Sequence, residues 1–146
     1  MEYRKKVFGF TFIALLVVIS FLAVHADAAA TTARQNVDSP YFRAGTKIEA
    51  VKLEITPGSG AAANPIIAET TIPEGLTVSN LKTTNGSAAV AGNKITWTLS
   101  SPTAKVEMTY DLTVPAANPP LFALLDSAVK EGTLQITLST TLKHEP

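Results

Sequence analysis

The sequence predicts an all-β protein, built as one antiparallel β-sandwich of about seven strands behind an N-terminal hydrophobic signal helix. Three observations predict this class. From Lys47 onward the chain consists of short apolar stretches rich in Val, Ile and Thr. In the strongest of these stretches apolar and polar residues alternate, as in strands with one face toward water. Gly, Pro and Asn separate the stretches at intervals of about ten residues, a spacing typical of sandwiches and barrels.

The first 26 residues have the composition of a secretory signal peptide. Arg4, Lys5 and Lys6 precede an uncharged run from Val7 to Val24, and the small residues around Ala26 follow at once. A basic region, an apolar region and a small-residue exit define such a signal. We expect cleavage after Ala26 or after Ala28. An uncleaved anchor is the alternative, because 18 apolar residues lie at the lower limit of a membrane span.

The next segment, residues 27–46, is predicted to be a flexible leader. Its first part, from Asp27 to Gln35, contains small and polar residues and no large apolar side chain. Such a segment offers little surface to bury and is most often mobile after cleavage. The folded module is therefore expected to span residues 47–146.

Within the module, alternation predicts the strands and turn residues predict their ends. Trp97 lies in phase with apolar neighbours in one strand and Tyr110 in another, so both are expected in the core. Pro73-Glu74-Gly75, Asn85-Gly86 and Gly92-Asn93 are expected to form turns. The predicted strands cover residues 51–55, 65–72, 76–83, 87–91, 94–100, 105–114 and 134–142.

One segment departs from the strand pattern. It begins with Pro119 and Pro120, and Leu121, Leu124, Leu125 and Ala128 follow at helical spacing. Proline is favoured in the first turn of a helix. We therefore expect residues 119–129 to form a short helix or a compact loop that caps one end of the sandwich.

Three short sequence segments, which lie in the predicted strands and turns, resemble segments of a known family in type and in order. They are the turn 73–79 (Pro-Glu-Gly-Leu-Thr-Val-Ser), the strand 92–97 (Gly-Asn-Lys-Ile-Thr-Trp) and the strand 110–115 (Tyr-Asp-Leu-Thr-Val-Pro). The chain from Val51 to Pro115 is similar to the Ig-like repeat modules of bacterial cell-surface and secreted proteins, the conserved-repeat (DUF11-type) family. The resemblance implies an Ig-like sandwich with a structural, spacer or adhesive role and no catalytic residues.

A second resemblance concerns the N-terminus. Residues 9–19, beginning Gly-Phe-Thr-Phe-Ile, are similar to the start of type IV pilins and pseudopilins. In those proteins the peptidase cuts after the Gly, and the apolar stretch remains as an assembly helix. Here Ala14 replaces the acidic residue of that family, and Phe8 replaces the basic residue before Gly9. Despite these two departures, the resemblance implies an alternative function, a pilin-like filament subunit that assembles through its N-terminal helix.

The charge of the chain excludes two classes of partner. The chain has 12 basic and 12 acidic residues, and removal of residues 1–26 leaves 12 − 3 = 9 basic and 12 − 1 = 11 acidic residues, a net charge of −2. A broad basic patch for nucleic acid is therefore not expected. No polybasic segment for anionic lipid is present either, so membrane contact is expected only through the N-terminal segment if it stays uncleaved.

The residue inventory argues against an enzyme. The chain has no Cys and only two His residues, His25 in the signal and His144 near the C-terminus. Thiol catalysis, Ser-His-Asp catalysis and Cys-based zinc sites are thus excluded. No calcium-loop spacing and no close carboxylate pair is found. Glu107 and Asp111 project from one polar strand face, either as an acidic strip for a cation or as a solvated face. We expect no catalytic residue, cofactor or metal.

Candidate contact residues are the aromatic side chains outside the alternating pattern, namely Tyr41 and Phe42 in the leader and Phe122 in the capping segment. Exposed apolar clusters often mark contact sites, although these rings could also fill the end of the sandwich. Together the observations predict an exported, non-catalytic protein, secreted or held at the periplasm or cell surface. Its role is expected to be structural, adhesive or protein-binding, toward a protein or another component of the cell envelope.

Overall fold

The computed structural model describes residues 29–59 and 64–146, and this part of the chain contains ten strands and no helix. The predicted signal segment and its alternative cleavage points after Gly9, Ala26 and Ala28 lie outside the described residues. The strands are β1 (Thr32–Asn36), β2 (Tyr41–Phe42), β3 (Lys47–Thr56), β4 (Ile66–Thr71), β5 (Thr77–Thr83), β6 (Ser87–Ala91), β7 (Lys94–Thr98), β8 (Val106–Thr113), β9 (Phe122–Glu131) and β10 (Leu134–His144).

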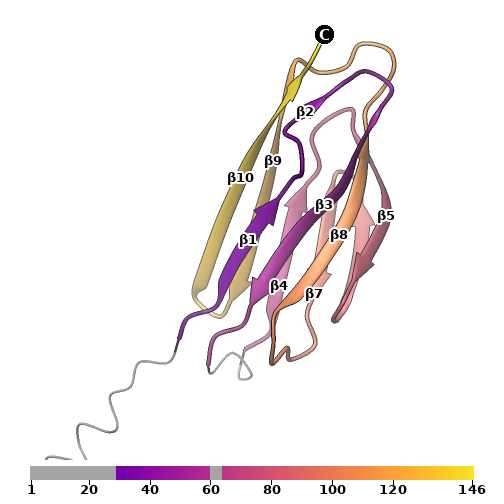
Figure 1. The fold of residues 1–146 in the computed structure, drawn as a ribbon. Coiled ribbons are helices and arrows are strands. Elements are labelled where there is room, and N and C mark those ends of the chain that lie inside the picture. The colour runs from indigo at the N-terminus through magenta and orange to yellow at the C-terminus, as the bar shows by residue number, and fades with distance from the viewer. Residues whose placement is uncertain (1–28, 60–63) are drawn as a thin grey trace, which may run out of the picture.

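The strands form two sheets packed face to face, which confirms the predicted Ig-like β-sandwich (Figure 1). One sheet has four strands in the order β1-β3-β8-β5, and the other has six in the order β2-β10-β9-β4-β7-β6. Neighbouring strands are antiparallel except for β2 and β10, which pair in parallel over two residues. The described chain enters at one end of the sandwich, and its C-terminus lies beside β2 at the opposite end (Figure 1).

The core contains the apolar residues that alternate in the sequence. Trp97 is fully buried and Tyr110 is 1% exposed, as predicted. The Trp97 indole N–H donates a 2.7 Å hydrogen bond to the carbonyl oxygen of Asn85. The Tyr110 hydroxyl, on β8, bonds to the Thr70 side chain on β4 of the facing sheet. Both aromatic residues therefore pack in the interior and still satisfy their polar atoms.

The prediction of a flexible leader over residues 27–46 is wrong where the leader contains β1 and β2. β1 pairs antiparallel with β3, from Thr32 opposite Thr56 to Asn36 opposite Lys52. Backbone pairing and the Gln35 side chain hold this polar strand in place, since Gln35 bonds to the Leu125 carbonyl and the Thr140 hydroxyl of the other sheet. The sandwich therefore begins at β1 rather than at residue 47.

The helix or loop predicted for residues 119–129 is also wrong over most of its length, because β9 begins at Phe122. β9 lies between β10 and β4. It pairs with β10 from Phe122 to Glu131 and with β4 from Asp126 to Glu131. Its inward residues include Ala123, Leu125 and Val129, all buried. This backbone pairing, together with the burial of one face of β9, favours a strand over the helix that the local spacing suggests.

Candidate contact surface

The structure separates the three predicted contact residues into two classes. Tyr41 is 55% exposed and Phe122 is 64% exposed, whereas Phe42 is 3% exposed and belongs to the core. Adjacent residues of a strand point to opposite faces, so β2 necessarily places one of its two aromatic rings inside and the other outside. Phe42 is thus a core residue, and Tyr41 and Phe122 are free to contact another molecule.

The two exposed rings lie on the same surface although 81 positions separate them in the chain. In β10, Lys143 pairs with Tyr41 of β2 on one side and with Phe122 of β9 on the other. Directly opposed residues share one face of a sheet. Tyr41, Lys143 and Phe122 therefore form one row across the outer face of the six-stranded sheet, at the end where the chain terminates.

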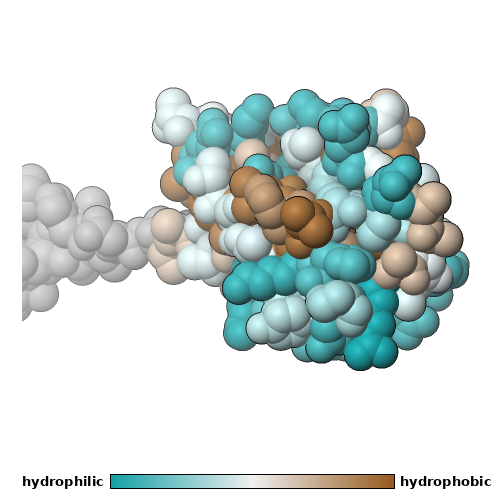
Figure 2. Space-filling view, turned by 90° about the horizontal axis from the view of Figure 1, so that it is seen from above, coloured by the Kyte–Doolittle hydropathy of each residue, from teal (hydrophilic) through white to brown (hydrophobic). Residues whose placement is uncertain are grey.

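Two leucines extend this row into an apolar surface. Leu124 is 49% exposed and follows Phe122 by two positions on the same face of β9, and Leu121 is 78% exposed just before the strand. We name Tyr41, Leu121, Phe122 and Leu124 the end surface. Figure 2 looks down on this end of the sandwich and shows a compact hydrophobic patch bordered by hydrophilic residues.

A shallow hollow adjoins the end surface on the side of the β4–β5 turn. Phe122 and Leu124 line it together with Pro120, Glu74 and Asn118. Anchor side chains of protein interfaces commonly fill such hollows in the partner. The hollow thus adds shape to a surface that would otherwise be flat.

Several contacts fix the end surface to the sandwich. The Phe42 ring packs against the His144 ring with a centroid distance of 5.7 Å, and Arg43 pairs with Glu145 at 3.1 Å. The Glu145 N–H donates to the Phe42 carbonyl at 2.8 Å, and the His144 N–H donates to the Leu121 carbonyl at 2.9 Å. These backbone bonds join β2, the C-terminus and the start of β9, so the exposed rings project from an ordered base.

Leu121 and Leu124 were missed as contact residues because their spacing predicted a helix. One signal in the sequence does point to them. Residues 121–125 read Leu-Phe-Ala-Leu-Leu, which places large apolar residues on both faces of any strand formed there. In a sheet with one face toward water, such a run exposes apolar side chains.

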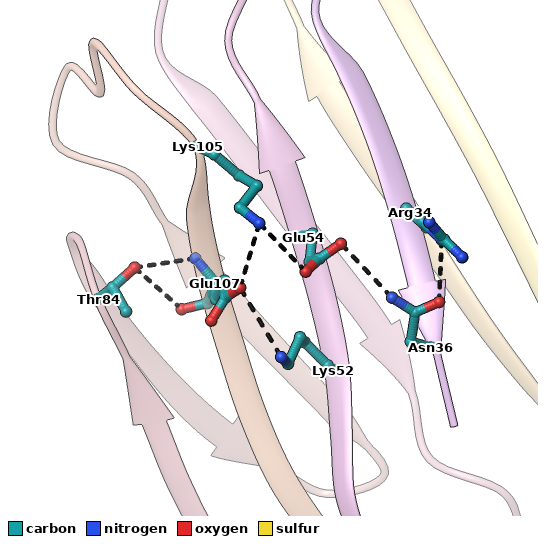
Figure 3. A network of polar contacts seen from close by, with 7 residues as sticks. All are labelled: Arg34, Asn36, Lys52, Glu54, Thr84, Lys105 and Glu107. Carbon is teal, nitrogen blue, oxygen red and sulfur yellow. Dashed lines mark hydrogen bonds and ion pairs between the residues drawn. The ribbon is translucent and has the colours of Figure 1, made fainter. Parts of the chain in front are cut away.

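The acidic strip predicted as a possible cation site is occupied by protein partners. Figure 3 shows Glu107 between Lys52 and Lys105, at 3.8 Å and 3.6 Å, and Glu54 at 3.5 Å from the same Lys105. Within residues 29–59 and 64–146, no three His, Cys, Asp or Glu side chains are grouped to hold a metal ion. The strip is therefore a network of ion pairs on a solvated face.

Asp111, the other member of the strip, also has its own partners. The Ala50 N–H donates to one carboxylate oxygen at 3.0 Å, and the Asn80 amide donates to the other at 2.6 Å. These bonds, the one from Ala50 above all, hold the pKa of Asp111 below its ordinary value. Both carboxylate oxygens of Asp111 thus serve the fold.

No described segment is a helix of the length and apolar character needed to cross a membrane. The carboxylates of Glu54, Glu107 and Asp111 are engaged by other groups of the sandwich. The end surface is consequently the feature of this part of the chain that is best suited to contact another molecule.

Comparisons with known proteins give likeness in structure without likeness in sequence. No family model matches the chain, and no curated protein matches it in sequence. The structure is similar to BcpA, the major pilin subunit of Bacillus cereus, with a TM-score of 0.63 and 10% identity over 80% of this chain and 40% of that one. It is also similar to the N-terminal domain of the Streptococcus gordonii adhesin Sgo0707, with a TM-score of 0.56 and 11% identity over 82% and 33% of the two chains.

A third likeness is to the full-length major pilin SpaD of Corynebacterium diphtheriae, with a TM-score of 0.53 and 12% identity over 75% of this chain and 33% of that one. The chain thus spans between 33% and 40% of the length of these three structures. At identities this low the likeness concerns the fold. The chain has the sandwich fold that these pilin and adhesin structures also contain.

Proposed function

We propose that this chain is an exported, non-catalytic Ig-like module of the DUF11 type that makes protein contacts at or outside the cell surface. The end surface is the observation on which this proposal rests. It places two aromatic rings and two leucines, each between 49% and 78% exposed, on a rigid end of the sandwich. Exposed groups of large apolar side chains with polar residues around them often mark sites of contact with another protein.

The position of the end surface supports a contact role. The described chain enters the sandwich at one end, and the end surface lies at the other, beside the C-terminus (Figure 1). β9, which joins the two ends, has ten residues and a length of about 33 Å. If residues 7–24 hold the chain in a membrane or lead it through one, the end surface points away from that attachment.

The fold, the scarcity of Cys and His, and the N-terminal sequence support the structural, non-catalytic and exported parts of the proposal. Similar sandwiches occur in two proteins named major pilins and one named an adhesin, which favours a structural or adhesive role over catalysis. The chain has no Cys, and its one described His, His144, packs against Phe42. Export rests on the basic, apolar and small-residue regions of the first 26 residues.

Export and contact can be tested separately. For export, the mature N-terminus is determined by mass spectrometry in medium, periplasmic and membrane fractions of the producing cells. A start at Asp27 or Ala29 in a soluble fraction supports a cleaved signal, and an intact start in membranes supports an anchor. A chain found uncleaved in the cytoplasm contradicts the proposal.

For contact, a photo-reactive amino acid replaces Phe122 in the full chain, and intact cells are irradiated. We expect a covalent adduct with one defined surface or secreted protein. The matched control carries the same group at Val90, which is 47% exposed on β6 at the far edge of the same sheet. Adducts that are absent, or identical from positions 122 and 90, would show that the end surface has no specific partner.

The alternative function is a filament subunit. It is favoured by the resemblance of residues 9–19 to the start of type IV pilins. Because β1 begins at Thr32, an assembly helix that starts at Phe10 would have to end before that position. The same measurement of the N-terminus separates the two functions. A mature start at Phe10 would support the filament subunit and would contradict export by a cleaved signal.

A further inference from the structure

The edge formed by β10 differs from the other sheet edges of this molecule. β10 is 11 residues long, and β2 covers only Lys143 and His144 on its outer side. Among residues 29–59 and 64–146, the one further backbone group that bonds to β10 on that side is the Pro40 carbonyl oxygen, which accepts from the Lys143 N–H. The segment from Leu134 to Leu142 therefore offers nine consecutive residues with one unpaired edge.

Proteins usually protect such edges with charges, prolines, bulges or short strands. The other three edges of this sandwich have such features. β1 carries Arg34, β5 carries Lys82 beside a register shift, and β6 has only five residues. By contrast, residues 134–142 read Leu-Gln-Ile-Thr-Leu-Ser-Thr-Thr-Leu, without charge or proline, and their register with β9 is unbroken. This edge is open to pairing with another strand.

The direction of the free backbone groups follows from two hydrogen bonds. The His144 N–H points to β9, where it donates to Leu121, whereas the Lys143 N–H points outward, where it donates to Pro40. Backbone groups alternate in direction along a strand. The N–H and C=O groups of alternate residues upstream of Lys143 therefore face the open edge. These residues are Gln135, Thr137, Ser139 and Thr141.

The inner face of the same strand is incompletely covered. Ile136 and Leu138 point inward and pack against the core, yet both are only partly buried, whereas Leu142 at the end covered by β2 is fully buried. An additional strand beside β10 would cover the exposed parts of these two side chains. Backbone pairing and apolar burial thus both favour the addition of a strand beside β10.

We propose that β10 pairs antiparallel with β10 of a second copy of this chain, about a two-fold axis at Leu138. The sequence around this residue allows such pairing. Leu138 is the centre of the free segment 134–142, so this register uses all nine residues. Thr137 then faces Ser139 of the second copy, Leu138 faces its equivalent, and no charged residue of the segment faces another charge.

This register also matches the backbone geometry. Residues 135, 137, 139 and 141, which carry the free groups, lie opposite residues 141, 139, 137 and 135 of the second copy, and each such pair exchanges two hydrogen bonds. The two six-stranded sheets then continue as one. Leu138 occupies the position between hydrogen-bonded pairs, where opposed side chains are closest.

The geometry restricts which copies can pair. The two sandwiches of an antiparallel pair point in opposite directions, so their N-terminal ends lie far apart. The pairing therefore suits released chains, or chains held on two facing surfaces, rather than neighbours attached to one surface. This inference does not depend on the contact role proposed for the end surface, which lies on the outer face of the sheet.

The test compares charge variants of the full chain, purified under one condition and analysed by sedimentation over a range of concentrations. Thr137→Lys/Ser139→Lys places lysine opposite lysine twice in the proposed register, whereas Thr137→Lys/Ser139→Glu places lysine opposite glutamate. We expect the first variant to raise the dissociation constant of the dimer by about tenfold or more and the second to restore dimers. Ala89→Lys/Ala91→Lys, on the outer face of β6, is the matched control and should leave dimers unchanged.

A crosslink tests the register itself. Because the chain has no Cys, Leu138→Cys introduces a single thiol, which should form a disulfide-linked dimer on mild oxidation. Val90→Cys, at the other edge of the same sheet, should not. Circular dichroism and thermal unfolding confirm that each variant folds.

Three results would overturn the proposal. They are a wild-type chain that stays monomeric, dimers that both charge variants weaken equally, and dimers that form without a Leu138→Cys crosslink. If a monomeric chain instead gained a strand from another protein, the edge would be a site for an extended segment and the two-fold pairing would be wrong.

Discussion

The Ala50 N–H donates a 3.0 Å hydrogen bond to the Asp111 carboxylate across the boundary between β3 and β8. On the other side of β8, the Asn80 amide of β5 bonds to the same carboxylate at 2.6 Å. Ala50 and Asn80 both have positive φ angles, 51° and 52°, and each lies where its strand shifts register against β8. Asp111 therefore holds two β-bulges, one on each neighbouring strand.

We expect Asp111→Ala to lower the melting temperature of the full chain, because two bulges that contain residues in an unfavourable conformation lose their common acceptor. Glu107→Ala, in the ion-pair network of the same strand, is the control and should change the melting temperature less, since exposed ion pairs contribute little. Equal losses in the two variants would show that the Asp111 bonds have no special role.

The same carboxylate should make stability depend on pH. Its hydrogen bonds hold the pKa of Asp111 below its ordinary value in the folded chain, so the unfolded chain binds the proton first as pH falls. The stability from Asp111 is therefore present above the ordinary Asp pKa and is lost as pH falls through the folded pKa. Thermal unfolding from about pH 7 to about pH 2 should show a smaller decrease for Asp111→Asn than for the wild type. Parallel curves would contradict this assignment.

A polar network connects the two sheets inside the sandwich. The Ser127 hydroxyl donates to the Gln35 side-chain oxygen at 2.6 Å and lies 2.8 Å from the Thr70 hydroxyl. The Gln35 amide donates to the Leu125 carbonyl and the Thr140 hydroxyl. We expect Gln35→Ala to reduce the free energy of unfolding by about 1–3 kcal/mol, because these partners lose their bonds.

Urea denaturation of the full chain measures this loss. Gln135→Ala is the control, since Gln135 is exposed on β10 and should cost less than about 0.5 kcal/mol. If the two variants were equally stable, the network would add nothing to the attachment of β1.

The strands of the interior could be predicted because their pattern is local. In residues 51–55 of β3 and in β7 and β8 every second residue is apolar, and the structure buries those residues, Trp97 and Tyr110 among them. β1 lacks this signal. Its position depends on pairing with β3 and on Gln35 contacts with residues 90 to 105 positions away, which no window of sequence contains.

β9 and the end surface illustrate a different limit. Phe122, Leu124 and Ala128 are apolar on the outer face and Ala123, Leu125 and Val129 on the inner face, so the local pattern fits a helix as well as a strand. Only the two neighbouring strands decide between them. The exposure of Phe122 follows from that choice, and the helix or loop predicted for this segment was wrong.

Trp97 combines a large buried volume with one polar atom. We expect Trp97→Ala to cost about 3–5 kcal/mol of unfolding free energy through the cavity that it leaves. Trp97→Phe should cost less, about 1–3 kcal/mol, because most of the volume remains but the Asn85 carbonyl loses its donor. Urea unfolding followed by circular dichroism measures both losses. A Trp97→Phe variant as stable as the wild type would show that the indole N–H is dispensable.

The two glycine turns that flank β6 offer a matched pair of substitutions. Gly86 and Gly92 both have positive φ, +70° and +60°, so alanine at either position costs about 1–2 kcal/mol of backbone strain. At Gly92 an added Cβ meets nothing within 4 Å, whereas at Gly86 it would lie 2.0 Å from the Thr98 carbonyl oxygen. Gly86→Ala must therefore also separate the β5–β6 hairpin from the end of β7.

We expect Gly92→Ala to cost only the strain and Gly86→Ala about 3 kcal/mol or more. In urea denaturation, Gly86→Ala should have a lower midpoint than Gly92→Ala at the same slope of free energy against urea concentration. The clash destabilises the folded chain, whereas the unfolded chains of the two variants are alike. Equal midpoints would mean that the hairpin moves away from Thr98 at little cost, and the close packing of this turn would then contribute little to the stability of the sandwich.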